Sequence, residues 1–444
     1  MSTRHNRFLI WIPLFLLGCS PWLSTPFGVM SEYNRMAQLD LWPGFKPAQI
    51  SVAIYDGKDT YLFRHPHPPE EFSPVKGHYG TWLYRGQHEA VNSNTNVQLA
   101  DWPTATIIIS PEVKVSMPQL AAVAIHEAFH VFQSQRYPAW TANEMDLLIY
   151  PDDDADLLAL RRLETAALRS AIRAQKEEDA ARWALSALTH RQDRFSRMTP
   201  NAAAYERGTE LKEGLAQYVQ SRAQAGRLKP DLPDEGFPLS KIRQRCYQTG
   251  HAWALLLDRF LPRWHTYLDS VKSTSLDQLL SQSIILQAYE PHRFPAPVKS
   301  HIQKRAKQDV RNLQAQIQRK RKRYFSRSGW LVTLSLPDRP LNVMGFDPMN
   351  IEKLGSGELL HTRWLKLGSQ NGSLEVLDNT VLTKTGCDHP LLPGIQELIM
   401  AGLPTPPQVE IRADTVRIQG HGLTLHFHGL HVSRSDQTKT IRLE

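Results

Sequence analysis

The sequence has little of several features that define particular classes of protein. Three cysteines in 444 residues are too few for a disulfide-rich scaffold or a cysteine-rich zinc finger. The apolar run at the amino terminus, Phe8–Leu17, has ten residues and is too short to cross a bilayer as a helix. No Gly-x-Ser-x-Gly, dinucleotide-type or phosphate-loop motif occurs. The remaining composition, 41% hydrophobic and 22% charged, is typical of a folded protein of two or three domains.

The positive net charge is confined to one segment. The whole chain carries +8, but Lys299–Arg327 contains eleven Lys or Arg and one acid, Asp309, so this segment carries +10 and the rest −2. A broad basic face for nucleic acid is therefore not expected. Apolar residues recur at helical spacing and predict a basic amphipathic connector helix over 301–327, which either is solvated or rests on anionic lipid. They are Ile302, Ala306, Val310, Leu313 and Ile317.

Residues 1–19 have the pattern of a signal peptide, with Arg4 and Arg7 before the apolar run. The run ends in Leu16-Leu17-Gly18-Cys19, which resembles the lipobox of bacterial lipoproteins, where the cysteine becomes the lipidated first residue of the mature chain. A plain signal peptide cleaved nearby is the alternative. Both patterns predict an extracytoplasmic protein. Ser20 after Cys19 resembles lipoproteins of the outer membrane, which implies a lipid anchor in the cell envelope, on the periplasmic side.

Three stretches of different periodicity follow, and together they predict an α+β fold. Residues 48–115 predict strands, with a hairpin turn at Asp56-Gly57-Lys58-Asp59. Residues 118–290 are rich in Ala and Leu at helical spacing, and residues 328–444 return to short strand patterns. Cys246 and Cys387 either pair in an oxidising compartment or remain free buried thiols. The strands expected in the first stretch are 50–55, 60–63, 81–84, 96–99 and 104–109.

One predicted helix carries residues that can bind a metal ion or take part in catalysis. Ten of the thirteen residues from Leu120 to Phe132 are apolar, and the three polar ones are His126, Glu127 and His130. Residues four apart lie about 40° apart around a helix, so both imidazoles face the same point. Neutral imidazoles bind Zn²⁺, and an adjacent carboxylate can accept a proton from a metal-bound water. Two core histidines bonded to neighbours are the alternative, but burying all three groups is costly unless something pairs with each.

A zinc ion needs a third protein ligand. A metzincin site is excluded, because Gln133 and Arg136 stand where glycine and histidine would be required. Further along, Glu213-Gly214-Leu215-Ala216 resembles the Glu-Gly-x-Ala helix that supplies the third ligand in gluzincin metallopeptidases. Gly214 and Ala216 are small enough to let that helix approach the metal helix closely.

Other acids near this motif leave alternatives for the third ligand. Glu210 could replace Glu213 or hold a zinc-bound histidine, and Glu164 is a weaker candidate. Glu206, Glu210 and Glu213 share one helical face, so a solvated acidic face is also an open interpretation.

The motif pair as a whole resembles gluzincin zinc metallopeptidases over residues 48–260, and it also resembles uncharacterised bacterial secreted proteins. The resemblance implies a zincin-like domain over 20–300, made of a small β-sheet and a helical active-site region, followed by a mostly-β domain over 328–444. The 82 residues between His130 and Glu213 imply an inserted helical pair around 155–195.

The resemblance also implies a mechanism. His126, His130 and Glu213 would bind one Zn²⁺, and Glu127 would act as general base and then as proton donor. A peptide or protein substrate would be held by pairing with an edge strand. A developing oxyanion needs a further donor, for which Tyr247 and His251 are the candidates, together with Tyr205.

We therefore expect a secreted, lipid-anchored zinc metallopeptidase that binds no nucleic acid. One alternative is a non-catalytic envelope lipoprotein with a structural metal site and a β domain that binds partners. Another is a zinc hydrolase that acts on a different bond, such as a cell-wall amide. The sequence leaves the substrate and the oligomeric state open.

Overall fold

The computed structural model of the chain describes residues 25–110, 115–270, 274–285 and 289–444. The expected signal peptide, with Cys19 and Ser20, lies outside the described residues. The chain divides into two compact units, Met1–Pro138 with Ala216–Lys229, and Ala139–Leu215 with Pro230–Glu444. Within the described ranges, no helix has both the length and the apolar character needed to cross a membrane.

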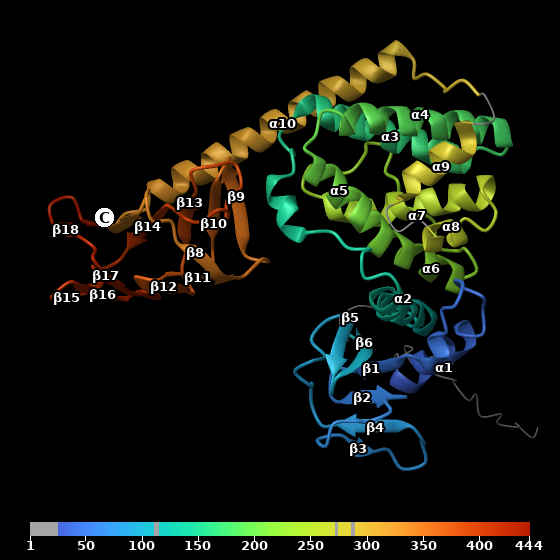
Figure 1. Cartoon of the computed structure of the whole chain (residues 1–444), viewed down its shortest axis with the longest axis horizontal. Coiled ribbons are helices and arrows are strands. Elements are labelled where there is room, and N and C mark those ends of the chain that lie inside the picture. The colour runs from blue at the N-terminus through green and yellow to red at the C-terminus, as the bar shows by residue number, and fades with distance from the viewer. Residues whose placement is uncertain (1–24, 111–114, 271–273, 286–288) are drawn as a thin grey trace, which may run out of the picture. The chain divides into compact units, whose positions relative to one another are not determined.

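The first unit contains a six-stranded sheet in the order β3-β4-β2-β1-β6-β5 (Figure 1). The predicted hairpin forms because Gly57 has a φ of +93° and the Asp56 carboxylate accepts hydrogen bonds from the backbone N–H groups of Lys58 and Asp59. β1 pairs with β6 in parallel, and the other pairs are antiparallel. The elements are α1 (Pro26–Met36), η1 (Pro47–Gln49), β1 (Ser51–Tyr55), β2 (Thr60–Phe63), β3 (Ser73–Pro74), β4 (Thr81–Tyr84), β5 (Thr95–Leu99), β6 (Trp102–Ile108), α2 (Met117–Arg136) and α6 (Leu215–Ala223).

The second unit begins with a helical region. The helical pair expected around 155–195 is present as α3 and α4, which pack against each other. A helical run from Pro200 to Ala223 passes through α5, the π-helical turn η3 and α6. The elements are η2 (Glu144–Ile149), α3 (Ala155–Arg173), α4 (Glu177–Phe195), α5 (Pro200–Thr209), η3 (Glu210–Gly214), α7 (Ile242–Phe260), α8 (His265–Ser270), α9 (Leu276–Ile285) and α10 (Ala296–Phe325).

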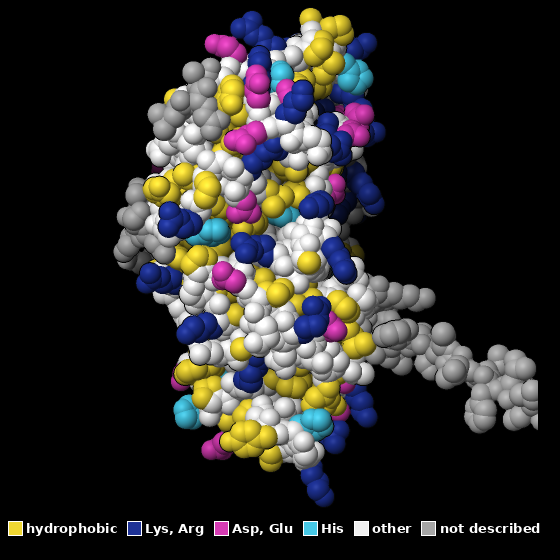
Figure 2. Space-filling model, turned by 90° about the vertical axis from the view of Figure 1, so that its right-hand side faces the viewer, with side chains coloured by type: hydrophobic (Ala, Val, Ile, Leu, Met, Phe, Trp, Pro, Cys, Tyr) yellow, Lys and Arg dark blue, Asp and Glu magenta, His cyan; other side chains and the backbone are white. Residues whose placement is uncertain are grey.

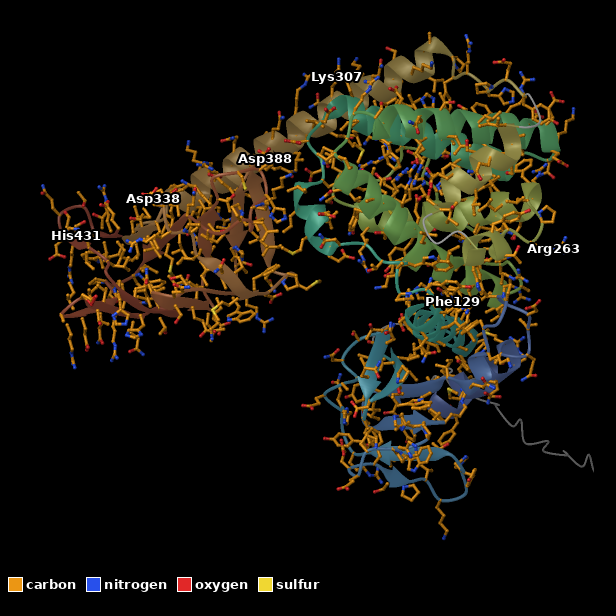
Figure 3. The ribbon with its side chains drawn as sticks, viewed as in Figure 1. Phe129, Arg263, Lys307, Asp338, Asp388 and His431 are labelled. Carbon is orange, nitrogen blue, oxygen red and sulfur yellow. The ribbon has the colours of Figure 1, made fainter. Side chains whose placement is uncertain are left out.

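The carboxyl-terminal part of this unit is built from two sheets, in the orders β18-β19-β7-β14-β13-β10-β9 and β15-β16-β17-β12-β11-β8. Inward-facing residues of both sheets, such as Leu334 and Leu425, form one buried core. Asp338, Asp388 and His431 are labelled on this part in Figure 3. The strands are β7 (Trp330–Ser335), β8 (Asn342–Phe346), β9 (Ile351–Gly355), β10 (Glu358–His361), β11 (Trp364–Ser369), β12 (Gly372–Leu377), β13 (Val381–Lys384), β14 (Glu397–Leu403), β15 (Gln408–Arg412), β16 (Thr415–Gly420), β17 (Leu423–His428), β18 (Val432–Ser435) and β19 (Thr440–Leu443).

The α+β class with a carboxyl-terminal β-rich region is therefore confirmed, whereas zincin-like architecture stays a prediction. The basic helix begins at Ala296, five residues before its expected start, because Pro297 suits the first turn of a helix. On the face seen in Figure 2, Lys and Arg side chains are scattered among acidic and hydrophobic ones, without a broad basic field.

Candidate metal centre

The helix α2 carries both histidines on a buried surface. Its amino terminus is closed by a capping box, in which the Ser116 backbone N–H donates to Gln119 Oε1 at 3.1 Å. The helix packs against α1, β6 and β5, and Phe129, labelled in Figure 3, is fully buried. The exposed fractions of His126, Glu127 and His130 are only 6%, 8% and 6%. Buried polar groups at these levels need hydrogen-bond partners or a bound ion.

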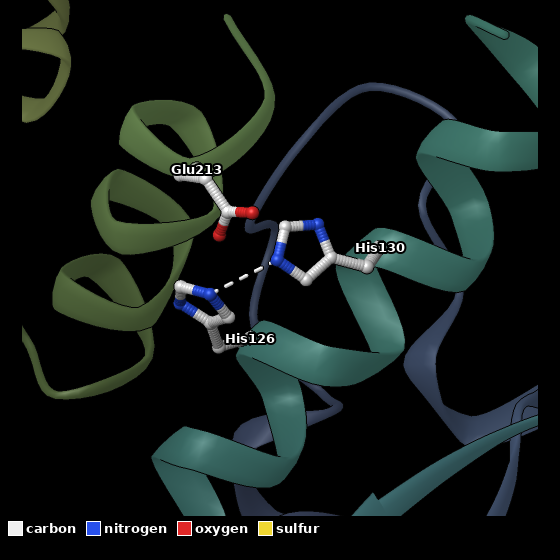
Figure 4. A group of neighbouring side chains, drawn as sticks. All are labelled: His126, His130 and Glu213. Carbon is white, nitrogen blue, oxygen red and sulfur yellow. Dashed lines mark hydrogen bonds between the residues drawn. The ribbon is translucent and has the colours of Figure 1, made fainter. Parts of the chain in front are cut away.

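The two imidazoles are oriented through their Nδ1 atoms. His126 Nδ1 lies 3.1 Å from Gln220 Oε1, and His130 Nδ1 lies 2.8 Å from Gln133 Oε1. An amide oxygen only accepts, so the tautomer with the proton on Nδ1 suits both contacts, and in that tautomer Nε2 is the atom that binds a metal ion. The two Nε2 atoms are 3.1 Å apart (Figure 4). At this distance one Nε2 can donate a hydrogen bond to the other, and a metal ion can take the place of that shared proton.

Glu213 completes a group suited to a metal ion. One ligand atom from each of His126, His130 and Glu213 lies within 4.8 Å of the other two, and all three residues are buried. Figure 4 shows the Glu213 carboxylate directed toward the imidazole pair. Tetrahedral zinc with bonds of about 2.0–2.1 Å separates its ligand atoms by about 3.3 Å, close to the observed Nε2 separation. The donor set therefore fits Zn²⁺, although the structure does not identify the metal.

A π turn directs Glu213. A regular α-helix would place Glu206, Glu210 and Glu213 on one face, but η3 spans Glu210–Gly214 and takes more residues per turn. Glu213 is therefore rotated around the axis relative to the other two acids. Such turns are often found at functional sites.

The glycine of the Glu213 motif has a different neighbour from the one expected. A Cβ on Gly214 would lie 2.6 Å from Gly250 Cα, and a Cβ on Gly250 would lie 2.7 Å from Glu210 O. The close approach that Gly214 permits is therefore to α7, and the expectation that it serves the metal helix is wrong.

The other acids of this run are buried in a cluster with arginines. Glu210 accepts from Arg191 through both carboxylate oxygens and from Thr249 Oγ1 at 2.6 Å. Glu206 and Glu164 are fully buried, and both pair with Arg194 and Arg245. The interpretation of Glu206, Glu210 and Glu213 as a solvated acidic face is therefore wrong, since none is more than 5% exposed.

Burial and the charge of these arginines oppose each other in the cluster. At Glu210, burial outweighs Arg191 and raises the pKa of the carboxyl group. Burial alone would raise the pKa of Glu206, but Arg194 and Arg245 outweigh it and hold that pKa well below its usual range. Asp277 behaves in the same way, because Arg191 and Arg207 lower its pKa despite burial. Both carboxyl groups are ionised at neutral pH.

Arg243 and Tyr247 lie beside Glu213. Arg243 donates to Glu213 Oε1 at 2.9 Å and approaches the Tyr247 hydroxyl at 3.4 Å. Burial, followed by the charge of Glu213, raises the pKa of Tyr247 above its usual value. The hydroxyl therefore keeps its proton at neutral pH and can donate it in a hydrogen bond.

The remaining expected residues are placed as follows. His251 is fully buried on α7. Tyr205 is on α5, where its hydroxyl donates to Glu144 Oε2 at 3.1 Å. Cys246 and Cys387 are both free thiols, and Cys387 is exposed rather than buried. Of the candidate oxyanion donors, Tyr247 lies beside Arg243, which donates to Glu213.

Three residues of the site were not recognised from the sequence. Gln133 could have been found, because it lies one turn beyond His130 on the same helix, and Gln220 lies two turns beyond Glu213. Arg243 had no local signal, since it is thirty residues from Glu213.

Comparison with known proteins adds nothing to these observations: no family model, curated protein or solved structure matches the chain.

Proposed function

We propose that this protein is a zinc-dependent hydrolase of gluzincin type that cleaves peptide bonds and is lipid-anchored outside the cytoplasm. The observation that supports the proposal is the pair of Nε2 atoms, 3.1 Å apart, on imidazoles that contact Gln220 and Gln133 and lie within reach of the buried carboxylate of Glu213. A zinc ion bound there supplies a Lewis acid and lowers the pKa of a water to about 7.

Glu127 performs the proton transfer in this proposal. It follows His126 directly on α2, is 8% exposed and is not among the three ligands. Its carboxylate accepts the proton of the attacking water and then donates it to the leaving amine. Tyr247, which is protonated at neutral pH, is the proposed hydrogen-bond donor to the developing oxyanion.

The first sheet supports a peptide as the substrate. β5 is its terminal strand, pairs with β6, and packs against the metal helix α2. An extended peptide that pairs with β5 continues the sheet by backbone hydrogen bonds, which suit any sequence of side chains. A peptidase therefore accounts for an edge strand beside the metal helix.

Elemental analysis combined with Glu127→Gln tests the proposal. We expect about one zinc per chain in both proteins and a loss of hydrolysis of an unstructured protein by a factor of about 10²–10⁴ in the variant. Glu410→Gln, the same change at an exposed position on β15, is the matched control and should leave activity unchanged. A variant that keeps both metal and full activity would contradict the mechanism.

Two other outcomes would replace the proposal. Bound metal without hydrolysis of any substrate would indicate a structural metal site in a binding protein. Hydrolysis of cell-wall fragments but not of unstructured proteins would retain the zinc mechanism and change the substrate.

A further inference from the structure

The helix α10 has two faces of different character. Ala306 and Val310 pack with Leu158 and Ala159 of α3, and Tyr324 is buried against the carboxyl-terminal sheet, where its hydroxyl donates to Ile399 O at 2.7 Å. These contacts occupy one side of the 30-residue helix. The opposite side faces solvent.

The solvent side carries a line of basic residues, which we call the basic stripe. At 100° per residue, Lys304, Lys307, Arg311 and Lys322 fall within about 60° of one another around the axis, with Ala306 and Tyr324 on the far side. All four are exposed, and Lys307 is labelled on α10 in Figure 3. The stripe is about 27 Å long, at about 1.5 Å per residue.

The stripe is not neutralised within the described part of the chain. Three basic residues off the stripe are paired there: Arg305, Lys320 and Arg321 form salt bridges with Glu235, Glu352 and Glu358. The acid of the segment, Asp309, pairs with Arg162. None of the described residues forms a salt bridge with the four residues of the stripe. Their charge is available to an external anion.

We propose that the basic stripe binds the anionic head groups of a membrane surface. A straight line of four cations matches a flat anionic surface better than it matches a single small ligand. From Ala296 to Arg323 the helix contains no Phe, Tyr or Trp on which unpaired bases could stack, which disfavours single-stranded nucleic acid. The choice of lipid also agrees with the expected anchor at Cys19, which would hold the chain near a membrane. Binding does not depend on the metal centre.

Vesicle sedimentation of the full chain carrying Cys19→Ser tests the stripe. The measured quantity is the ratio of the partition coefficient on phosphatidylglycerol-containing vesicles to that on pure phosphatidylcholine vesicles. Any contribution of the apolar amino-terminal run enters both terms of this ratio. Each cation near an anionic surface contributes about a fivefold increase in binding, so a ratio above about 10 is expected, falling as salt is added.

The variant Lys304→Glu/Lys307→Glu/Arg311→Glu should lower the ratio at least about tenfold. Its control, Lys76→Glu/Lys229→Glu/Arg442→Glu, makes the same change in net charge at exposed positions elsewhere and should keep the ratio. Circular dichroism confirms that both fold. A parent ratio near one, or an equal loss in the control, would overturn the proposal. Binding to duplex DNA without vesicle binding would also overturn it.

Discussion

Two clusters of buried ionisable side chains are built on one helical run, from Pro200 to Ala223, and they differ in how charge is balanced. Before and within the π turn, Glu206 and Glu210 meet guanidinium groups of the same chain. Three residues later, Glu213 lies with two imidazoles whose Nε2 atoms are 3.1 Å apart. The first cluster contains its own cations, and the second is arranged to accept one.

The difference in charge balance explains why neighbouring glutamates have different roles. A buried carboxylate must be compensated, and removing one partner of a buried pair leaves an uncompensated charge. Glu210 accepts hydrogen bonds from Arg191 through both carboxylate oxygens, although burial still raises the pKa of Glu210, so we expect its contribution to be to stability. Glu213 forms an ion pair with Arg243, whose side chain is 40% exposed, so solvent screens this attraction. A metal ion held by Glu213 and the two histidines would add a positive charge beside the Glu213 carboxylate.

Exchanging the two acids for amides should separate these roles most strongly. Glu213→Gln removes a ligand, so zinc affinity should fall by more than about 100-fold, since loss of an outer hydrogen-bond partner alone costs about 10–100-fold. Glu210→Gln leaves Arg191 with less compensation and should lower the free energy of unfolding by about 3–5 kcal/mol while zinc binding persists in the folded fraction. Zinc titration and urea unfolding of both variants measure the difference.

The opposite result for the two variants would contradict the roles given to Glu210 and Glu213. If Glu210→Gln abolished zinc binding in folded protein and Glu213→Gln retained it, Glu210 would be the ligand. Glu410→Gln, at an exposed strand position, controls for the chemical change and should alter neither quantity by more than about 0.5 kcal/mol.

The part of the site that is local in sequence could be predicted, and the part that depends on distant segments could not. The helix around Leu120–Phe132 and the hairpin at Asp56–Asp59 follow from periodicity and turn chemistry over a few residues. The buried partners of Glu206 are Arg194 and Arg245, which come from two other helices. No spacing rule relates an acid to arginines on distant helices. The sequence therefore could not show whether Glu206 is buried or solvated.

The π turn is a further limit of prediction. Regular helical geometry puts Glu210 and Glu213 on the same face, which left both as candidate ligands. One altered turn at η3 separates them, and no residue type in Glu210–Gly214 indicates a π turn reliably. The close packing of Gly214 against Gly250 accompanies this turn and also comes from a distant helix.

A smaller loss of zinc affinity is expected when a glutamine that contacts an imidazole is replaced. Gln133→Leu removes the acceptor of His130 Nδ1, so the imidazole loses its preferred tautomer and zinc affinity should fall by about 10–100-fold. Gln119→Leu, at an exposed position on the same helix, is the control for side-chain change and should affect the helix cap but not zinc. Unchanged affinity in Gln133→Leu would show that this hydrogen bond does not orient the ligand.

The smallest expected effect is on the pH dependence of the free energy of unfolding, and it concerns the cluster of acids and arginines. The pKa of Asp277 is lowered in the folded protein, so the unfolded chain binds more protons below about pH 4 and the stabilisation is lost on acidification. Asp277→Asn should therefore reduce the dependence of the unfolding free energy on pH between about 4 and 2, by no more than about 1.4 kcal/mol per pH unit. Asp40→Asn, at an exposed carboxylate, provides the reference slope in urea unfolding at each pH. An Asp277→Asn slope equal to the parent's would mean that the arginines of the cluster do not stabilise the ionised acid, and the contrast between a self-compensated cluster and one that accepts a metal ion would fail.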